Sequence, residues 1–341
     1  MEELLFAFGW SFVLSYLLLY VYIRIAHKKG WLAKDVHKSQ EVYVADRGGL
    51  ILFLIPLLSV PLLYYEFLYE YVAFVCSIIL GLLVGLVDDL KDLGLKKAIF
   101  VMISALPILL VSHLVESGYG LLYNPRPYIP FIGFTRMYLV YPLFIMALYS
   151  VMADACNMID IYNGTLLYQG LAVLFPLFII AIMGMHTMSI ILIAIGLGYT
   201  LGFLYWNKYP ARVFHGNVGA YGYGVMLSSI MILSAKELIG VEFIAIIGFL
   251  PAIFNGFIYV FNTRFAPKSA VSRQLKSNFV ENGVLKPNLN PDAAIDLSRL
   301  ILLHGEMTEK ELISMYLILF TISAVLALLT GVMIVHGYME L

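Results

Sequence analysis

Charged residues are scarce in this sequence. Asp, Glu, Lys and Arg together make up 13% of its 341 residues, whereas a soluble domain carries about 25%. Hydrophobic residues make up 62%, and the mean hydropathy is +0.90, which excludes a disordered chain and a soluble globular protein. The net charge of −1 also argues against a nucleic-acid partner held by a large positive surface. The composition indicates an all-α polytopic membrane protein.

The sequence also has only two cysteines, and no basic residue precedes its first apolar run. Cys76 and Cys156 lie far apart in apolar surroundings, so we expect buried free thiols, with one disulfide as the alternative. Glu2 and Glu3 precede the first apolar run, and positive charge follows it from Arg24 onward. This is the reverse of a signal peptide, and it predicts a retained first helix with its N-terminus outside the cytoplasm.

Ten apolar runs are long enough to cross a bilayer as helices. They lie at residues 4–26, 48–65, 70–88, 98–116, 137–153, 165–184, 187–206, 217–235, 240–262 and 312–336. An even number places both termini on one side. On this topology 18 of the 21 basic residues face the opposite side, which the positive-inside rule makes cytoplasmic.

All nine Asp residues lie on the same predicted cytoplasmic side. The positive-inside rule does not require this, because acidic residues contribute little to it. Short carboxylates gathered with Lys and Arg favour a cytoplasmic active site, although helix capping would also explain Asp35 and Asp292. Three polar motifs and one long loop supply the candidate site residues.

The first motif is the adjacent pair Asp88 and Asp89 at the end of the third predicted span. Two carboxylates at a membrane edge are costly unless they bind something. Their oxygens suit Mg²⁺, and Lys96 and Lys97 follow as candidate phosphate ligands. A solvated helix end is the alternative.

The second motif, residues 154–164, places Asp154, Asn157 and Asp160 three residues apart, so on a helix they would share a face and form a ligand site. The third motif is residues 209–224, whose glycines from Gly216 onward lead into a helix, and a helix N-terminus would favour an anion there. Close helix packing is the alternative for Gly222 and Gly224.

The long loop at residues 263–311 is expected to recognise substrate, since long loops are often functional. Its first part is basic. Residues 281–283 (Glu-Asn-Gly) predict a hairpin turn. Residues 290–292 (Asn-Pro-Asp) predict the start of an amphipathic helix that runs to about Leu303 on the membrane surface.

In this order, these segments resemble the polyprenyl-phosphate N-acetylhexosamine-1-phosphate transferase superfamily. The similarity is greatest to the UDP-GlcNAc–dolichyl-phosphate GlcNAc-1-phosphotransferases of eukaryotes and archaea. It covers nearly the whole chain, as one transmembrane domain at residues 1–341. Further matching segments are residues 34–38 (Lys-Asp-Val-His-Lys), 105–107 (Ala-Leu-Pro), 206–214 (Trp-Asn-Lys-Tyr-Pro-Ala-Arg-Val-Phe) and 304–309.

The resemblance implies transfer of a sugar 1-phosphate, GlcNAc 1-phosphate by preference, from a UDP-sugar to a polyprenyl or dolichyl phosphate with release of UMP. This is the first membrane step of lipid-linked oligosaccharide synthesis for protein N-glycosylation. The implied cofactor is Mg²⁺, with Mn²⁺ as the alternative. The implied setting is a cell or endoplasmic-reticulum-type membrane, and a homodimer is a further expectation.

Matching positions imply the following roles. The catalytic residues are Asp88, Asp89 and Lys97. The metal ligands are Asn157 and Asn217, with Asp154 and Asp160 beside them. The substrate-binding residues are Lys38, Asn163, Arg212, Lys268 and Arg273, of which Asn163 holds the uracil end and the last two hold the pyrophosphate and sugar. The lipid tail would lie near spans five, eight and nine.

Two positions depart from the family pattern. The family has a metal-binding Asp where this chain has Asn217, and an amide oxygen is a weaker ligand for a hard cation. Residues 268–273 keep only the basic ends of an Arg/His cluster. Either Asp154 or Asp160 supplies the missing charge, or Asn217 was introduced to trap a complex, or the protein binds its substrates but turns over poorly.

Other functions stay open at this point. A transporter or scramblase would carry charges near the middle of the membrane and an internal repeat, and neither is evident here. A binding subunit that kept the fold is compatible with Asn217. Within the enzymes, a bacterial-type undecaprenyl-phosphate transferase that uses another UDP-sugar is the alternative.

Overall fold

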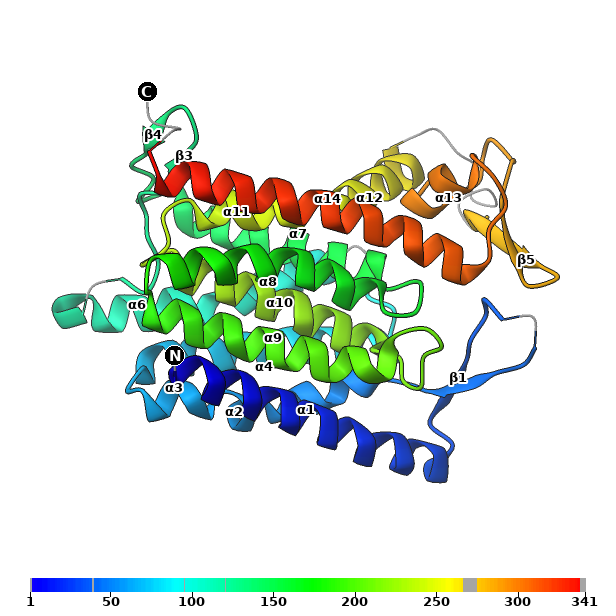
Figure 1. Cartoon of the computed structure of the whole chain (residues 1–341), viewed down its shortest axis with the longest axis horizontal. Coiled ribbons are helices and arrows are strands. Elements are labelled where there is room, and N and C mark those ends of the chain that lie inside the picture. Colours follow the sequence, from blue (N-terminus) through cyan, green and yellow to red (C-terminus); the bar gives the residue numbers. More distant parts are fainter. Residues whose placement is uncertain (1, 39, 95, 120, 266–274, 338–341) are drawn as a thin grey trace.

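The computed structural model describes residues 2–337 except 39, 95, 120 and 266–274. It is a bundle of helices with three two-stranded sheets (Figure 1). The helices are α1 (Glu2–Lys29), η1 (Gly48–Leu54), α2 (Ile55–Leu58), α3 (Val60–Tyr64), α4 (Leu68–Leu90), α5 (Lys96–Met102), η2 (Ile103–Ala105), α6 (Leu106–Tyr119), α7 (Tyr141–Ile159), α8 (Thr165–Met183), α9 (Thr187–Asn207), α10 (Gly216–Ser234), α11 (Val241–Gly248), α12 (Leu250–Val260), η3 (Phe261–Phe265), α13 (Leu297–Leu302) and α14 (Glu309–Val335). The antiparallel strand pairs are β1 (Leu32–Lys34) with β2 (Tyr43–Ala45), β3 (Tyr128–Ile129) with β4 (Gly133–Phe134), and β5 (Asn278–Glu281) with β6 (Val284–Pro287).

The predicted class, an all-α polytopic membrane protein, is confirmed. Seven helices in the described part are long and apolar enough to cross a membrane, or eight if α11 and the following helix count as one span bent by 65°. The predicted number of ten stays a prediction. Helix α1 begins and α14 ends at the same end of the bundle (Figure 1), as an even number of crossings requires. The β1 strand, β5 strand and α13 lie at the other end.

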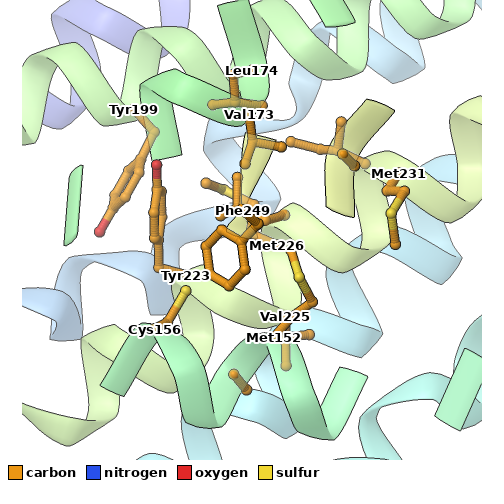
Figure 2. Close-up of a cluster of buried hydrophobic side chains, with 14 of the residues drawn as sticks. Met152, Cys156, Val173, Leu174, Tyr199, Tyr223, Val225, Met226, Met231 and Phe249 are labelled. Carbon is orange, nitrogen blue, oxygen red and sulfur yellow. The ribbon is translucent and has the colours of Figure 1, made fainter. Parts of the chain in front are cut away.

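Helix α10 forms the centre of the bundle. All its residues from Val218 to Ser234 are buried, and it packs against α4, α7 and α9. In Figure 2, Tyr223, Val225 and Met226 of α10 lie among side chains of α7, α8, α9 and Phe249. Small residues permit this close packing, since a Cβ on Gly224 would lie 2.5 Å from the Cα of Ala153 in α7.

Two local predictions were wrong in part. The second predicted span, residues 48–65, is divided into η1, α2 and α3, with Pro near the start of the last two, where its missing N–H is tolerated. Cys156 is buried but Cys76 is exposed on the surface of α4, although both are free thiols as expected.

Of the two predictions for the long loop, one is confirmed and the other is wrong in part. The hairpin is confirmed, and Asn282 and Gly283 both have positive φ, as a type I′ turn requires. The helix expected from residue 290 is instead the shorter α13, which Asp296 caps by accepting from the N–H of Arg299. Arg299 donates in turn to the carbonyls of Asn290, Ala293 and Ala294, and this holds the preceding segment outside the helix.

The contact between α10 and α7 gives a test of the packing. Gly224→Ala is expected to lower the free energy of unfolding by about 1–3 kcal/mol, because the added methyl meets backbone that cannot move aside. Gly9→Ala is the matched control, since a Cβ there meets nothing within 4 Å and Ala favours the helix. Thermal unfolding in detergent would show a drop for Gly224→Ala alone. An equal response of the two variants would contradict the close packing.

Candidate functional site

One cavity at the β1 end of the bundle gathers residues from separate predicted motifs. Its volume is about 220 Å³. The predicted residues that line it are Asn157, Asp160, Asn163 and Asn217. The first loop adds Asp35, His37 and Asp46, for which the sequence predicted no role at the site. The structure therefore brings the second and third motifs together with the loop after α1.

Asp88 lies beside this cavity as the acceptor of three hydrogen bonds. Its Oδ2 accepts from Lys97 Nζ at 3.2 Å and from Asn217 Nδ2 at 3.1 Å. Its Oδ1 accepts from the N–H of Leu93 at 3.0 Å. The reverse amide orientation would set the Asn217 oxygen against the carboxylate, so the chemistry selects the donor nitrogen. Asn217 thus links the first motif to the cavity.

Asp89 has a different task from its neighbour. Successive residues of a helix point about 100° apart, and Asp89 faces the start of α10, where backbone N–H groups have no partner within the helix. Its carboxylate accepts from the N–H groups of Asn217 and Val218 at 3.2 and 3.0 Å. The anion predicted at this helix N-terminus is therefore the protein's own carboxylate. Gly85 makes room, since a Cβ there would lie 2.6 Å from the Asn217 carbonyl oxygen.

The two remaining acids of the second motif face different partners. Asp154, in α7, accepts from the hydroxyl of Tyr221 at 2.7 Å and does not line the cavity. Asp160 follows the end of α7 and lies 3.9 Å from Nδ1 of His215. Burial raises the pKa of Asp160 to about 7 and lowers the pKa of His215 to about 3.

Both polar atoms of the Asn163 side chain have partners within the protein. Its Nδ2 donates to Glu309 at 2.7 Å and to Asp35 at 3.4 Å, and its Oδ1 accepts from the N–H of Ala211 at 2.6 Å. Its backbone N–H also donates to Glu309. The side chain predicted to hold uracil therefore joins the first loop, the segment before α10 and the start of α14.

Lys38 belongs to the same group of contacts around Asn163 and does not line the cavity. It forms ion pairs with Asp35 and Glu309 and lies 4.0 Å above the ring of Tyr209. In the described part of the chain, Asp35, His37 and Glu309 form the group whose possible metal-binding atoms lie within 4.8 Å of one another. Because Lys38 already supplies positive charge there, this group is a poor cation site. Burial lowers the pKa of His37 to about 4.

The other predicted basic residues lie elsewhere. Arg212 is exposed, with its guanidinium 5.5 Å from the ring of Trp206, and does not line the cavity. Lys268 and Arg273 fall outside the described residues. The described part of the long loop reaches the cavity through Tyr162, whose hydroxyl accepts from Asn278 of β5 at 2.9 Å.

The donor set fits a hard divalent cation. Asn157, Asp160 and Asn217 offer two amides and one carboxylate on the wall of one cavity, and oxygen donors of this kind suit Mg²⁺ or Mn²⁺. These three residues would hold the cation, whose charge would offset that of bound phosphates.

Several residues of the site were not predicted from the sequence. His215 and Tyr221 stand within the third motif, but their partners lie in the second. Asp46 lies outside every motif, and only its position among the charged residues of the first loop could have drawn attention to it. Tyr162 lies inside the second motif, but an aromatic side chain there gave no chemical signal.

Acids and amides around a cavity, with a lysine beside it at one end of the bundle, suit the binding of phosphates and a divalent cation. The model of glycosyl transferase family 4 matches residues 71–235. A protein of Saccharolobus solfataricus, provisionally named UDP-N-acetylglucosamine–dolichyl-phosphate N-acetylglucosaminephosphotransferase, is 30% identical over 64% of this chain and 68% of its own length.

Two further relatives are less than 30% identical to this chain. The UDP-N-acetylglucosamine–dolichyl-phosphate N-acetylglucosaminephosphotransferase of Schizosaccharomyces pombe is 24% identical over 77% of this chain and 69% of its own. A phospho-N-acetylmuramoyl-pentapeptide-transferase of Hydrogenobaculum is 27% identical over 61% and 64%. With a relative from Methanocaldococcus jannaschii included, the chain spans 58–69% of the length of these proteins. The chain belongs to the polyprenyl-phosphate N-acetylhexosamine-1-phosphate transferase superfamily, as the sequence motifs predicted.

The hydrogen bonds of Asn163 predict that this residue stabilises the fold. Asn163→Ala is expected to destabilise the protein by about 1–3 kcal/mol for each buried group left unpaired, because Glu309 and the Ala211 N–H both lose a partner. Chemical unfolding in detergent would measure the loss. Unchanged stability together with a raised KM for UDP-sugar would instead make Asn163 a direct substrate contact.

The contact between Asn217 and Asp88 predicts how a cation affects stability. Asn217→Asp replaces a donor by a second carboxylate beside Asp88, and like charges at this distance repel. Added Mg²⁺ is therefore expected to raise the Tm of this variant more than that of the unaltered protein. Asn217→Ala, which removes the donor without adding charge, is the control. An equal Mg²⁺ response in all three proteins would show that residue 217 does not face a cation.

Proposed function

We propose that this protein transfers a sugar 1-phosphate from a UDP-sugar to a polyprenyl phosphate and releases UMP, with GlcNAc as the sugar and dolichyl phosphate as the lipid. Membership of the superfamily supports the reaction class. The observation that carries the proposal is the cluster of Lys97, Asp88 and Asn217, which lies between a polar cavity and an apolar groove.

The apolar groove supports a lipid substrate. It has a volume of about 340 Å³ and lies between α4 and α5, with Val87, Leu93 and Phe100 among its lining residues. Val87 precedes Asp88, and the N–H of Leu93 donates to Asp88. A polyprenyl chain in this groove would bring its phosphate to Lys97. The groove therefore differs in place from the one expected near spans five, eight and nine.

The polar cavity supports a nucleotide-sugar. In the proposed reaction an oxygen of the lipid phosphate attacks the β-phosphorus of the UDP-sugar. The bond from that phosphorus to the oxygen bridging the two phosphates breaks, and UMP leaves with the bridging oxygen. Such transfers depend mainly on positioning and on neutralising charge. Lys97 would hold the lipid phosphate, and a cation at Asn157, Asp160 and Asn217 would neutralise the pyrophosphate.

The relative from Hydrogenobaculum supports the second candidate, because its name specifies a different transferred group, a phospho-N-acetylmuramoyl-pentapeptide. On that alternative the chain would use undecaprenyl phosphate and another UDP-sugar with the same chemistry. The proposed setting is a multi-pass membrane protein with a cytoplasmic active site. The expected homodimer also stays a prediction.

The proposed function is tested by UMP release from UDP-GlcNAc and dolichyl phosphate with Mg²⁺. Lys97→Met is expected to lower the rate by about 10²–10³-fold, as loss of one charge-stabilising donor does elsewhere. Lys96→Met is the matched control, because Lys96 is the adjacent, exposed residue of the same helix and should keep the rate. Release with undecaprenyl phosphate and another UDP-sugar alone would select the second candidate. Absence of UMP with every donor and lipid would overturn the proposal.

A further inference from the structure

His215 is an imidazole buried without a hydrogen-bond partner. It is 0% exposed, and neither ring nitrogen has a partner in the described structure. A buried polar group without a partner is costly. The chain nevertheless places this residue directly before α10, next to the cavity. Because of this cost, we expect the ring to gain a hydrogen-bond partner when the site binds its ligands.

The imidazole is held firmly in place. Its ring stacks on Phe203 with the centroids 3.7 Å apart and the planes 8° from parallel. Its backbone carbonyl accepts from the N–H of Gly49 at 3.1 Å. Tyr199 and Tyr223, which lie together in Figure 2, complete the surrounding aromatic cluster. A ring fixed in this way can fix the orientation of whatever it contacts.

The carboxylate of Asp160 lies 3.9 Å from Nδ1 of His215. This exceeds a hydrogen-bond length. Among the described residues, Asp160 has no hydrogen bond and no ion pair with Lys or Arg. Lys97 pairs instead with Asp88, and Lys38 pairs with Asp35 and Glu309. Its side chain is 16% exposed and lines the cavity beside Asn157 and Asn217.

We propose that His215 is a positioning residue for Asp160, and that it orients the carboxylate so that Asp160, Asn157 and Asn217 together bind one divalent cation. The imidazole would donate from Nδ1 to one carboxylate oxygen and leave the other for the cation. Carboxylates that bind metals are ordinarily held by hydrogen bonds in this way. The inference rests on the cation of the proposed function.

This arrangement would provide a carboxylate where Asn217 provides none. Asn217 donates its amide nitrogen to Asp88, so it brings no negative charge to the cavity. The charge comes instead from Asp160, which lines the same cavity from the end of α7. Asp35 and Asp46 also line the cavity, but they pair with Lys38 and Arg47. The proposed ligand set then holds one anion and two amides, and its affinity would depend strongly on how well that anion is oriented.

The test is Mn²⁺ binding, measured by electron paramagnetic resonance of the free ion with the full chain in detergent. His215→Phe keeps a ring against Phe203 but removes both nitrogens. It is expected to weaken Mn²⁺ binding about 10–100-fold, the usual effect of losing a group that orients a ligand. His215→Asn keeps a donor amide and should recover most of the affinity.

Two variants make the result specific. Ser234→Ala removes a buried hydroxyl without a partner at the other end of α10 and should leave Mn²⁺ binding unchanged. Asp160→Asn should weaken binding at least as much as His215→Phe, and the double variant should be no weaker than Asp160→Asn alone, since the two residues act as a unit.

Several outcomes would overturn the inference. These are unchanged binding in His215→Phe or in Asp160→Asn, an equal loss in Ser234→Ala, or additive losses in the double variant. If His215→Phe does not fold, His215→Met, which also removes both ring nitrogens, takes its place with the same expected result. UMP release separates the two proposals: turnover with His215-independent Mn²⁺ binding refutes only the inference, and His215-dependent binding without turnover on any substrate refutes only the function.

Discussion

The start of α10 sets the arrangement of the whole site. This helix is buried along its length, so the free N–H groups at its N-terminus cannot be satisfied by water and need an acceptor within the protein. Asp89 supplies that acceptor. Once α4 and α10 are joined in this way, Asp88 must meet Asn217 and Lys97. The adjacent acids therefore have different partners: Asp89 joins the two helices, and Asp88 lies beside the cavity with Lys97 and Asn217.

The charges near the site are balanced locally, which explains how the net charge can be so small. Asp88 pairs with Lys97, and Lys38 lies between Asp35 and Glu309. Asp89 faces a helix N-terminus and lies 3.8 Å from Arg47. Asp160 is the exception among these described carboxylates, because it has no Lys or Arg partner and its Oδ2 lies 3.9 Å from Nδ1 of the buried His215.

Much of this site was predictable because its signals are local in the chain. The carboxylate pair ends an apolar run, and the Asn-Gly turn demands positive φ, so both could be recognised from a few neighbouring residues. The partners of Asn163 could not, because Asp35 and Glu309 lie 128 and 146 residues away. The α13 boundary failed for a related reason: Arg299 holds the carbonyls that the expected helix would have used.

The groove between α4 and α5 is lined by apolar side chains on the outer surface of the bundle. On the proposed function, a lipid that enters there arrives by diffusion within the plane of one leaflet. The concentration that governs its binding is then a surface density, the number of lipid molecules per unit of membrane area. Diluting the membrane in buffer would leave the rate per enzyme unchanged, whereas diluting the lipid substrate with other lipids would lower it.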